Sequence, residues 1–297
     1  MYELIMQAVL STPWAILPEK LAAIEALLAL RLAGGQVRAE DVAAATNGRR
    51  PATGPARAGA VAVLPIYGTI HQHAGMLLES SGGTATEAVS AALYQALDDP
   101  AVGAIVLDVD SPGGAVSGVD ELATQIYQSR GQKPIVAVAN SLMASAAYWI
   151  GSAADEVWVS PNGEAGSIGV YAAHQDVSQA LEKDGVRVSL LSAGRYKTEG
   201  NQFEPLTDEG RAALQGRVDA YYEKFVAAVA RGRGYAPVTV RNGFGEGRVL
   251  TAEAAVAAHL ADRVGTLADA VQRAASLARR RTSAQAAATF RLRAVGL

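Results

Sequence analysis

Two apolar runs separated by a helix-patterned segment constrain this fold more than any other feature. Residues 104–109 (AIVLDV) and 134–139 (PIVAVA) are almost continuously apolar, which is typical of strands buried on both faces of a sheet. Residues 118–128, between them, carry apolar side chains at helical spacing. A strand, a helix and a strand in this order imply parallel strands joined by a right-handed crossover. The sequence therefore predicts an α/β fold with a mostly parallel sheet.

Further segments extend this alternation along the chain. The other predicted strands are 61–67, 156–159, 168–172 and 187–191, and the other predicted helices are 18–33, 84–97, 142–153, 174–184, 208–231, 251–260 and 266–281. Thr84 or Thr86 is a candidate cap for its helix, because a threonine oxygen can accept from the amides of a first turn. Residues 46–59 lack periodicity and are rich in Pro, Gly and Arg, which predicts a linker.

These elements divide the chain into three expected parts. Residues 1–60 form an N-terminal helical segment and the linker, residues 61–271 form the α/β domain, and residues 272–297 form a basic tail. After Asp269 the chain has six arginines and no acidic residue. Such a run is either a solvated surface or a docking segment for an acidic partner, and the sequence leaves both readings open.

Charge and residue content exclude several classes of protein. The 26 basic and 29 acidic residues give a net charge of −3, which provides no overall field for binding nucleic acid. The chain has no cysteine and only four histidines, so we expect neither disulfides nor a metal centre.

One uncharged stretch, residues 134–154, is long enough to span a bilayer. Pro, Asn, Ser and Gly residues interrupt it, so we expect a buried strand and a buried helix there and no membrane span. The N-terminus carries Glu3 and lacks the basic segment of a secretory signal. We therefore expect a cytoplasmic location, with which the absence of cysteine is consistent.

A glycine pair follows the first apolar strand, in the segment Asp110–Gly114 (DSPGG). Ligands bind at loops of this kind, where the carboxyl ends of parallel strands meet helices. Without a Cβ, backbone amides at Gly113 and Gly114 could approach a substrate and hold a developing oxyanion. Pro-Gly-Gly is equally common in a plain turn, and these residues alone do not decide between the two.

Ser145 and Lys197 are candidates for nucleophilic catalysis. Ser145 follows the second apolar strand among small neighbours, at the start of a predicted helix whose positive end favours negative charge. Taken alone, it also fits a small packing residue. A serine nucleophile needs a base, which is usually histidine and otherwise a neutral lysine. His174 is 29 positions away, and Lys197 follows an apolar strand but also fits an exposed loop.

These motifs together resemble the signal peptide peptidase A family of serine–lysine peptidases, which share the Clp protease and crotonase fold. The resemblance runs from about Val61 to Val271. It is carried by VDSPGGAVSG (109–118), SLMASAAYW (141–149), SAADEVWVSPNGEAGSIGV (152–170), LLSAGRYK (190–197) and FGEGRVLTAEAA (244–255). Lys197 follows Ser145 by 52 positions, which is similar to the nucleophile-to-base spacing of the family. The segments around residues 173–186 and 192–211 look most like the phage-encoded branch, the capsid maturation proteases.

The resemblance implies a role for each matching residue. Ser145 is implied as the nucleophile, Lys197 as the general base and Ser167 as the residue that orients the lysine. The amides of Gly113 or Gly114 and of Ala146 are implied as the oxyanion hole. The chain departs from the family at Ala146-Ala147, where Gly-Gly is frequent; alanine keeps the amide, and only the width of the substrate cleft is put in doubt.

The implied activity is a serine endopeptidase that forms an acyl-enzyme without metal or cofactor. A free lysine titrates near ~10.4, so the base needs burial or positive neighbours to be neutral. The implied partners are phage scaffold, portal or coat proteins, the chain itself and further copies in a homo-oligomer. The chain ends are expected to be dispensable for peptide hydrolysis and to place the protein in the capsid precursor.

The sequence leaves three alternatives open. An acyl-CoA enzyme on the same fold would use the oxyanion amides without Ser145 or Lys197. An assembly protein could retain the fold without catalysis. A Clp-type serine–histidine arrangement is weaker, because the matching position falls near Val170 and not at His174.

Overall fold

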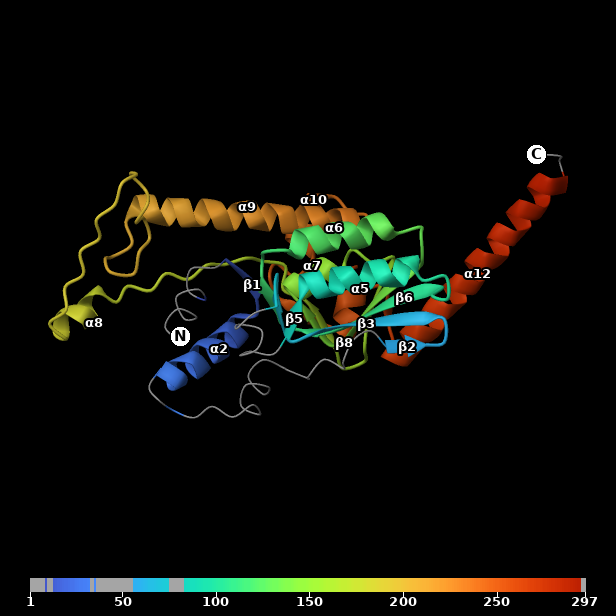
Figure 1. The fold of residues 1–297 in the computed structure, drawn as a ribbon, viewed down its shortest axis with the longest axis horizontal. Coiled ribbons are helices and arrows are strands. Elements are labelled where there is room, and N and C mark those ends of the chain that lie inside the picture. The colour runs from blue at the N-terminus through green and yellow to red at the C-terminus, as the bar shows by residue number, and fades with distance from the viewer. Residues whose placement is uncertain (1–8, 10–12, 33–34, 36–55, 75–82, 295–297) are drawn as a thin grey trace.

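The computed structural model describes residues 9, 13–32, 35, 56–74 and 83–294 (Figure 1). The strands are β1 (Trp14–Ile16), β2 (Ala56–Ala58), β3 (Val61–Tyr67), β4 (Thr69–His71), β5 (Gly83–Ala85), β6 (Ala104–Ser111), β7 (Gly113–Ala115), β8 (Ile135–Ala144), β9 (Glu156–Val159), β10 (Glu164–Gly166), β11 (Val249–Thr251) and β12 (Arg263–Val264). The helices are α2 (Pro18–Leu32), α5 (Thr86–Asp98), α6 (Val119–Ser129), α7 (Ala146–Gly151), α8 (Ser178–Lys183), α9 (Asp208–Arg233), α10 (Pro237–Gly243), α11 (Ala252–Ala257) and α12 (Leu267–Ala294).

The larger sheet has the strand order β11-β10-β8-β6-β3-β2, and β9 pairs with both β8 and β12. Strands β3, β6, β8, β9 and β10 run parallel, and β2 and β11 pair antiparallel at the two edges. The predicted α/β class with a mostly parallel sheet is therefore confirmed. A smaller sheet, ordered β1-β7-β4-β5, stands at the carboxyl end of β6.

Helices cover both faces of the larger sheet. Apolar residues of α5, α6, α7 and α9 pack on one face in the main core, and α12 packs on the other face through Ala270 and Ala274. Successive side chains of a strand point to opposite faces of the sheet, and a helical layer covers each face. Residues Ile105, Val106 and Leu107 of β6 are therefore all fully buried. Coverage on two sides explains why residues 104–109 of this strand are almost continuously apolar in sequence.

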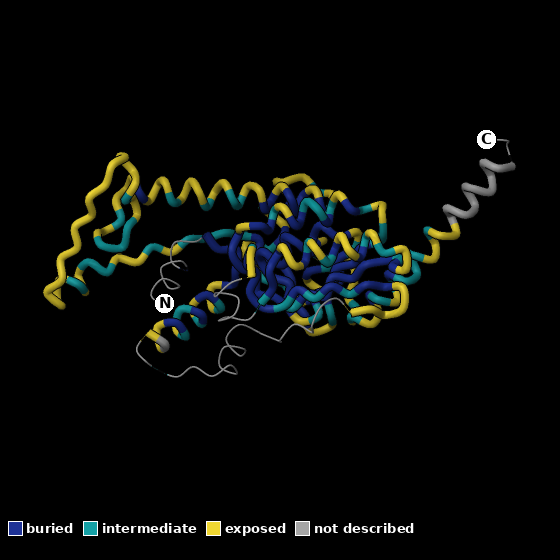
Figure 2. The backbone as a smooth tube through the Cα atoms, in the orientation of Figure 1, coloured by how far each residue is buried: buried dark blue, intermediate teal, exposed yellow. Residues whose placement is uncertain are grey.

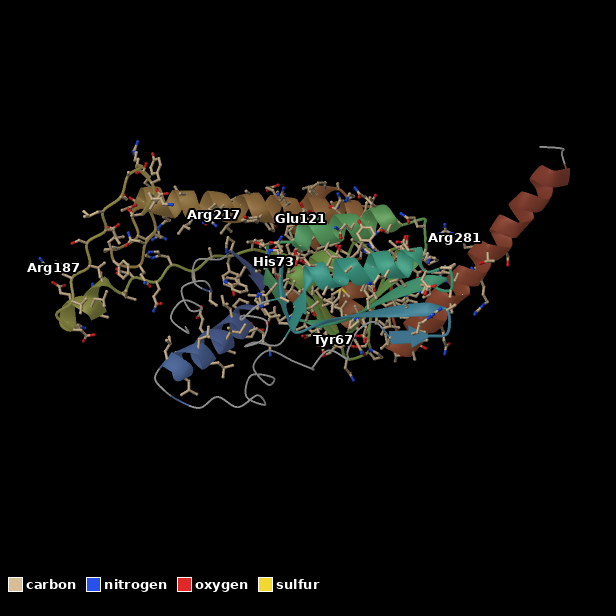
Figure 3. All side chains as sticks on the ribbon, in the orientation of Figure 1. Tyr67, His73, Glu121, Arg187, Arg217 and Arg281 are labelled. Carbon is tan, nitrogen blue, oxygen red and sulfur yellow. The ribbon has the colours of Figure 1, made fainter. Side chains whose placement is uncertain are left out.

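An arm formed by residues 174–207 extends away from the body together with the first half of α9 (Figure 1). None of its residues is buried, whereas the sheet and its covering helices are mostly buried (Figure 2). Arg187 lies at the far end of this arm, and Arg217 lies on the outward part of α9 (Figure 3). Thr207 caps α9 by accepting from the amide of Gly210 at 3.0 Å.

Two predicted strands are wrong. Residues 168–172 form no strand beyond one bridge between Tyr171 and Trp14, because the chain leaves the sheet after β10 at 164–166. Residues 187–191 lie on the arm, where no neighbouring strand of the described chain is available to pair with them.

Several helix predictions also need correction. The predicted helix 142–153 begins only at Ala146, because β8 continues through Ala144, and the predicted helix 174–184 contracts to α8. Neither Thr84 nor Thr86 caps α5: Ala85 holds the cap position, and no side chain bonds there. Helix α10 was not predicted.

Strand β1 and the first part of α12 pack on the body, and the rest of α12 projects away from it (Figure 1). Within the predicted linker, residues 46–55 lie outside the described residues and 56–58 form β2. Strand β1 pairs with β7 inside the α/β domain. The expected boundary at 271/272 falls within α12, which continues to pack on the sheet beyond it. Among the described helices, none is long and apolar enough to cross a membrane.

Candidate active site

Ser145 lies at the turn between β8 and α7 in a conformation that L-residues rarely adopt. Its φ is 56° and its ψ is −120°, and its amide donates to the carbonyl of Gly166 at 2.8 Å. Its Oγ reaches the Gly169 carbonyl at 3.5 Å, a long contact. Such a sharp strand-to-helix turn persists only where the surroundings hold it, and it frequently marks a functional serine.

The predicted glycine pair lies directly beside Ser145. A Cβ placed on Gly113 would lie 2.9 Å from the Cβ of Ser145 and 2.2 Å from the carbonyl oxygen of Ala15. A Cβ on Gly114 would lie 2.0 Å from the carbonyl oxygen of Ile70. No side chain fits at either position, so the glycines are required for the close approach of three backbone segments.

Both glycine amides already face acceptors within this chain. The amide of Gly113 donates to Ser111 Oγ at 3.2 Å, and that hydroxyl donates to the carbonyl of Gly68 at 2.6 Å. Gly114 stands opposite Ala15 in the pairing of β7 with β1. Ala146 is the first residue of α7, where backbone amides have no acceptor inside their own helix.

Ser167 lies in a second strained turn next to the first. Its φ is also 56°, and its amide donates to the carbonyl of Arg248 at 2.7 Å. The bond from Ser145 to Gly166 ties the two turns together. The structure thus brings Ser145, Ser167, Gly113, Gly114 and Ala146 into one region at the carboxyl ends of β6 and β8.

Lys197 is not part of this cluster within one chain. It lies on the exposed arm, and its ammonium has no hydrogen-bond or ion-pair partner among the described residues. His174 is also held elsewhere, since its Nε2 contacts the carbonyl of Asn201 at 3.0 Å. Neither candidate base touches Ser145 in the single chain.

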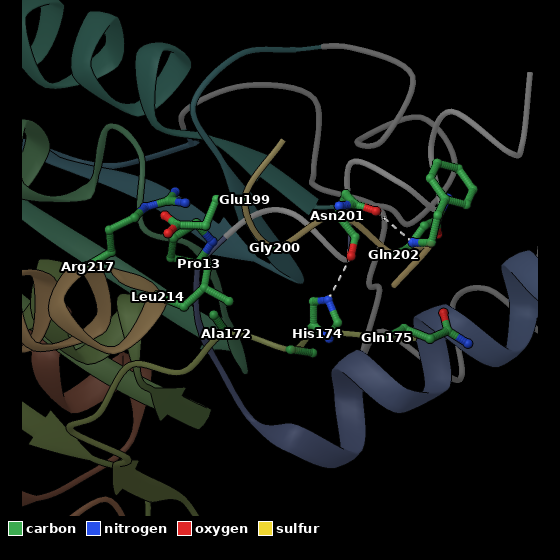
Figure 4. A pocket seen from close by; sticks show the side chains of 12 residues that line it. Pro13, Ala172, His174, Gln175, Glu199, Gly200, Asn201, Gln202, Leu214 and Arg217 are labelled. Atoms are coloured by element: carbon green, nitrogen blue, oxygen red, sulfur yellow. Dashed lines mark hydrogen bonds between the residues drawn. The ribbon is translucent and has the colours of Figure 1, made fainter. Parts of the chain in front are cut away.

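A cavity of about 350 Å³ opens at the base of the arm (Figure 4). Its lining includes Pro13, His174, Asn201, Leu214 and Arg217, contributed by the N-terminal segment, the arm and α9. Among the residues that the structure describes, no group of three or more His, Asp or Glu side chains is placed to hold a metal ion.

Sequence reasoning missed the N-terminal strand β1 as part of this region. Residues 14–16 pair with 113–115, and Leu17 donates its amide to the carbonyl of Pro112 at 3.0 Å. Three residues, WAI, are too few to show a period of two. No signal in the sequence connects them with a segment about a hundred positions away.

A serine held in a strained turn, beside glycine amides at the carboxyl ends of parallel strands, is an arrangement typical of serine hydrolases. The chain belongs to peptidase family S49, whose sequence pattern matches residues 128–281. This confirms the family resemblance found in the motifs.

Two named phage proteins are similar in sequence to this chain. The chain is 35% identical over 257 residues to capsid assembly protease C of Escherichia phage lambda, covering 86% of this chain and 56% of that protein. It is 36% identical over 225 residues to the head-tail preconnector protein GP5 of Enterobacteria phage P21, covering 76% of this chain and 44% of that protein. The chain thus spans about half the length of these curated relatives.

Among solved structures, a mutant of ClpP1 from Listeria monocytogenes matches with a TM-score of 0.42 and 15% sequence identity. The match covers 70% of this chain and 94% of the other.

Proposed function

We propose that this protein is a serine endopeptidase in which Ser145 attacks the scissile carbonyl of a peptide. The observation that carries the proposal is the strained turn of Ser145 beside the backbone of Gly113 in a chain of family S49. Ala146 directly follows Ser145, and a Cβ on Gly113 would lie 2.9 Å from the Cβ of Ser145, so the amides of Ala146 and of Gly113 or Gly114 are the proposed donors to an oxyanion formed there.

In the proposed reaction, Lys197 acts as the general base. The neutral amine takes the proton of Ser145 as Oγ bonds to the carbonyl carbon, and it then gives that proton to the leaving amine as the peptide bond breaks. Water hydrolyses the resulting acyl-enzyme, and Lys197 again moves the proton. Ser167 orients the amine by a hydrogen bond.

The position of Lys197 supports a site completed between copies. Its arm is exposed and carries large apolar side chains in water: Val186, Val188, Leu190, Leu191 and Tyr196. Leu191 is 97% exposed. Exposed apolar surface of this kind favours a protein partner. We therefore place Lys197 of one copy beside Ser145 of another in a homo-oligomer, where burial removes water from the amine and favours its neutral form.

The proposed substrates are proteins of phage prohead assembly, namely scaffold, portal or this chain itself, inside the host cytoplasm. The support is the similarity to two phage proteins named for capsid assembly and head–tail connection. The basic residues of α12 and the N-terminal segment are candidates for placing the enzyme in that assembly.

The test is mass spectrometry of capsid components co-expressed with the unaltered chain or with Ser145→Ala. We expect defined cleavage products only with the unaltered chain. Identical products with Ser145→Ala would refute the nucleophile, and normal particle maturation with Ser145→Ala would favour a non-enzymatic assembly protein.

A further inference from the structure

We infer that the N-terminal segment 13–17 occupies the strand position in which this protein binds its peptide ligand. The inference rests on the proposed function, because it takes Ser145 as the reacting group. The ligand class is an extended peptide that adds a strand to β7, with a small residue next to Ser145 and an aliphatic residue two positions further on. The chain therefore blocks its own site until this segment leaves.

The segment is bonded on both edges, as an inserted strand would be. On one edge Leu17 donates to Pro112 at 3.0 Å, and Val116 donates to Pro13 at 3.4 Å. On the other edge the amides and carbonyls of Trp14 and Tyr171 exchange two hydrogen bonds of 2.9 and 3.0 Å. Peptides bound by strand addition use main-chain bonds of this kind.

The register places Ala15 at the proposed oxyanion amides. Hydrogen-bonded pairs alternate along an antiparallel ladder, and the bonds of Leu17 and Val116 fix their phase. Ala15 and Gly114 therefore form the hydrogen-bonding pair between them. The carbonyl oxygen of Ala15 and the Cβ of Ser145 both lie within 3 Å of the point where a Cβ on Gly113 would be.

Burial of the nucleophile agrees with an occupied site. Ser145 is only 1% exposed, although a serine that attacks peptides must meet substrate. Ala15, which is fully buried, lies on the side of Ser145 where Gly113 leaves room. Removing the segment would open this side of the nucleophile.

The side chains of the segment define what the position accepts. The methyl of Ala15 is enclosed in the main core, which leaves space for a small residue only. Leu17 packs with Leu142, Ala144 and Val249, an aliphatic pocket that begins one residue before Ser145. Trp14 and Ile16 face the other way, into a cluster with α2 that anchors the segment.

The test measures binding of a fluorescent peptide with the sequence PWAILPEK, which copies residues 13–20. The full-length chain carries Ser145→Ala so that nothing is cut, and Trp14→Ala with Ile16→Ala weakens the internal strand. We expect the peptide to bind at least tenfold more tightly to this variant than to Ser145→Ala alone. Equal affinity would overturn the inference.

A matched control is Trp158→Ala in the same Ser145→Ala background. Trp158 is a similarly buried tryptophan that packs under α12 on the opposite face of the sheet. It should leave peptide affinity unchanged. A peptide with tryptophan in place of its alanine should bind at least tenfold more weakly, and equal binding of both peptides would contradict the assigned small-residue position.

Hydrogen exchange on the Ser145→Ala chain provides a second measurement that does not depend on strand-weakening substitutions. Saturating peptide should increase exchange at the amides of residues 14–17, and unchanged protection with peptide bound would overturn the inference.

Fluorophosphonate labelling of native Ser145 separates the two proposals. Faster labelling in the strand-weakened chain supports both. Absence of labelling in every variant, with the gain in peptide affinity retained, would refute the peptidase but leave the binding position intact.

Discussion

Ser145 and Ser167 each hold a φ of 56°, and such conformations cost about 1–3 kcal/mol at a residue other than glycine. Backbone bonds to Gly166 and Arg248 hold the two turns in place. The positions of both hydroxyls are therefore determined by the packing of β8, β10 and β11 around them, and a conservative change in either side chain should leave the turn intact.

The proposed dyad makes a direct prediction. Ser145→Ala and Lys197→Ala should each reduce peptide hydrolysis below about one hundredth of the unaltered rate, because each removes the nucleophile or its base. Lys197→Arg should fail as well, since a guanidinium does not deprotonate in proteins. Steady-state rates of peptide hydrolysis test this prediction, and circular dichroism checks that each variant is folded. Hydrolysis retained in any of the three would contradict the dyad.

His71 predicts a dependence of stability on pH. Burial lowers the pKa of His71 to about 4, whereas an unfolded histidine titrates near ~6.5. The unfolded chain therefore gains a proton at a higher pH than the folded chain. The free energy of unfolding should be fully retained above about pH 6.5 and should fall by up to about 3 kcal/mol as the pH approaches 4.

Urea unfolding at pH 7.5 and pH 5 measures this loss. His71→Phe should remove most of the difference between the two conditions, whereas His73→Gln, at an exposed histidine, should preserve it. A pH dependence unchanged in His71→Phe would show that another group is responsible.

At the scale of elements, the sequence predicted those strands and helices whose own residues carry a recognisable pattern. Strands β6 and β8 were predicted because burial on both faces makes residues 104–109 and 134–139 almost continuously apolar. The arm segment 187–191 is also largely apolar, with Val188, Leu190 and Leu191. A strand also needs a neighbour, however, and the pattern does not show whether one exists in the same chain. Strand β1 was missed because its pairing with β7 is wholly tertiary.

The candidate active site was likewise predicted only in part. The residues near Ser145 were predicted as a group from their motifs. The separation of Lys197 from Ser145 was not predicted, because a spacing in sequence does not determine the distance between two residues in the fold.

The contact between α12 and β9 gives a prediction at the scale of elements. Arg273 donates to both carboxylate oxygens of Glu156 on β9, at 3.0 and 3.1 Å from Nε and at 2.6 Å from Nη2. Burial raises the pKa of Glu156, but hydrogen bonds from Arg273 and Trp158 outweigh it and hold the pKa below its usual range. Arg273→Ala should therefore lower the free energy of unfolding by about 2 kcal/mol at pH 7.

The pair contributes stability above the unfolded pKa of glutamate, ~4.3, and loses it as the pH falls through the lower folded pKa. A double-mutant cycle with Glu156→Gln should give a coupling of about 1–2 kcal/mol at pH 7. Arg280→Ala, on the same helix, is the control. Additive effects in the cycle would show that the Arg273–Glu156 pair does not couple α12 to β9.

At the scale of the whole molecule, the proposed nucleophile Ser145 is buried in the body and is separated from the proposed base Lys197 on an exposed arm. Equimolar mixing of Ser145→Ala with Lys197→Ala should restore about a quarter of the unaltered activity, because one site in four then combines both native residues. Peptide hydrolysis after subunit exchange measures it. An inactive mixture that still assembles would place both residues in one copy.

The exposed apolar side chains of the arm should determine assembly. Leu191→Asp should shift the protein toward the monomer in sedimentation and reduce hydrolysis in parallel, since a charge at an apolar contact is costly to bury. Arg187→Gln, a change of a charged side chain on the same arm, is the matched control. A Leu191→Asp protein with unchanged sedimentation would argue against a contact through this apolar side chain.

The glycine pair of β7 also limits how descendants of this chain can diverge. At Gly113 and Gly114 any side chain would collide with a backbone oxygen, at 2.2 Å from Ala15 or 2.0 Å from Ile70, and a backbone oxygen cannot be exchanged by mutation. These two positions therefore cannot vary, whichever ligand the protein is selected to bind. Leu142 and Val249, which pack with Leu17, are ordinary side chains, so new preferences can arise there while the glycines are inherited unchanged.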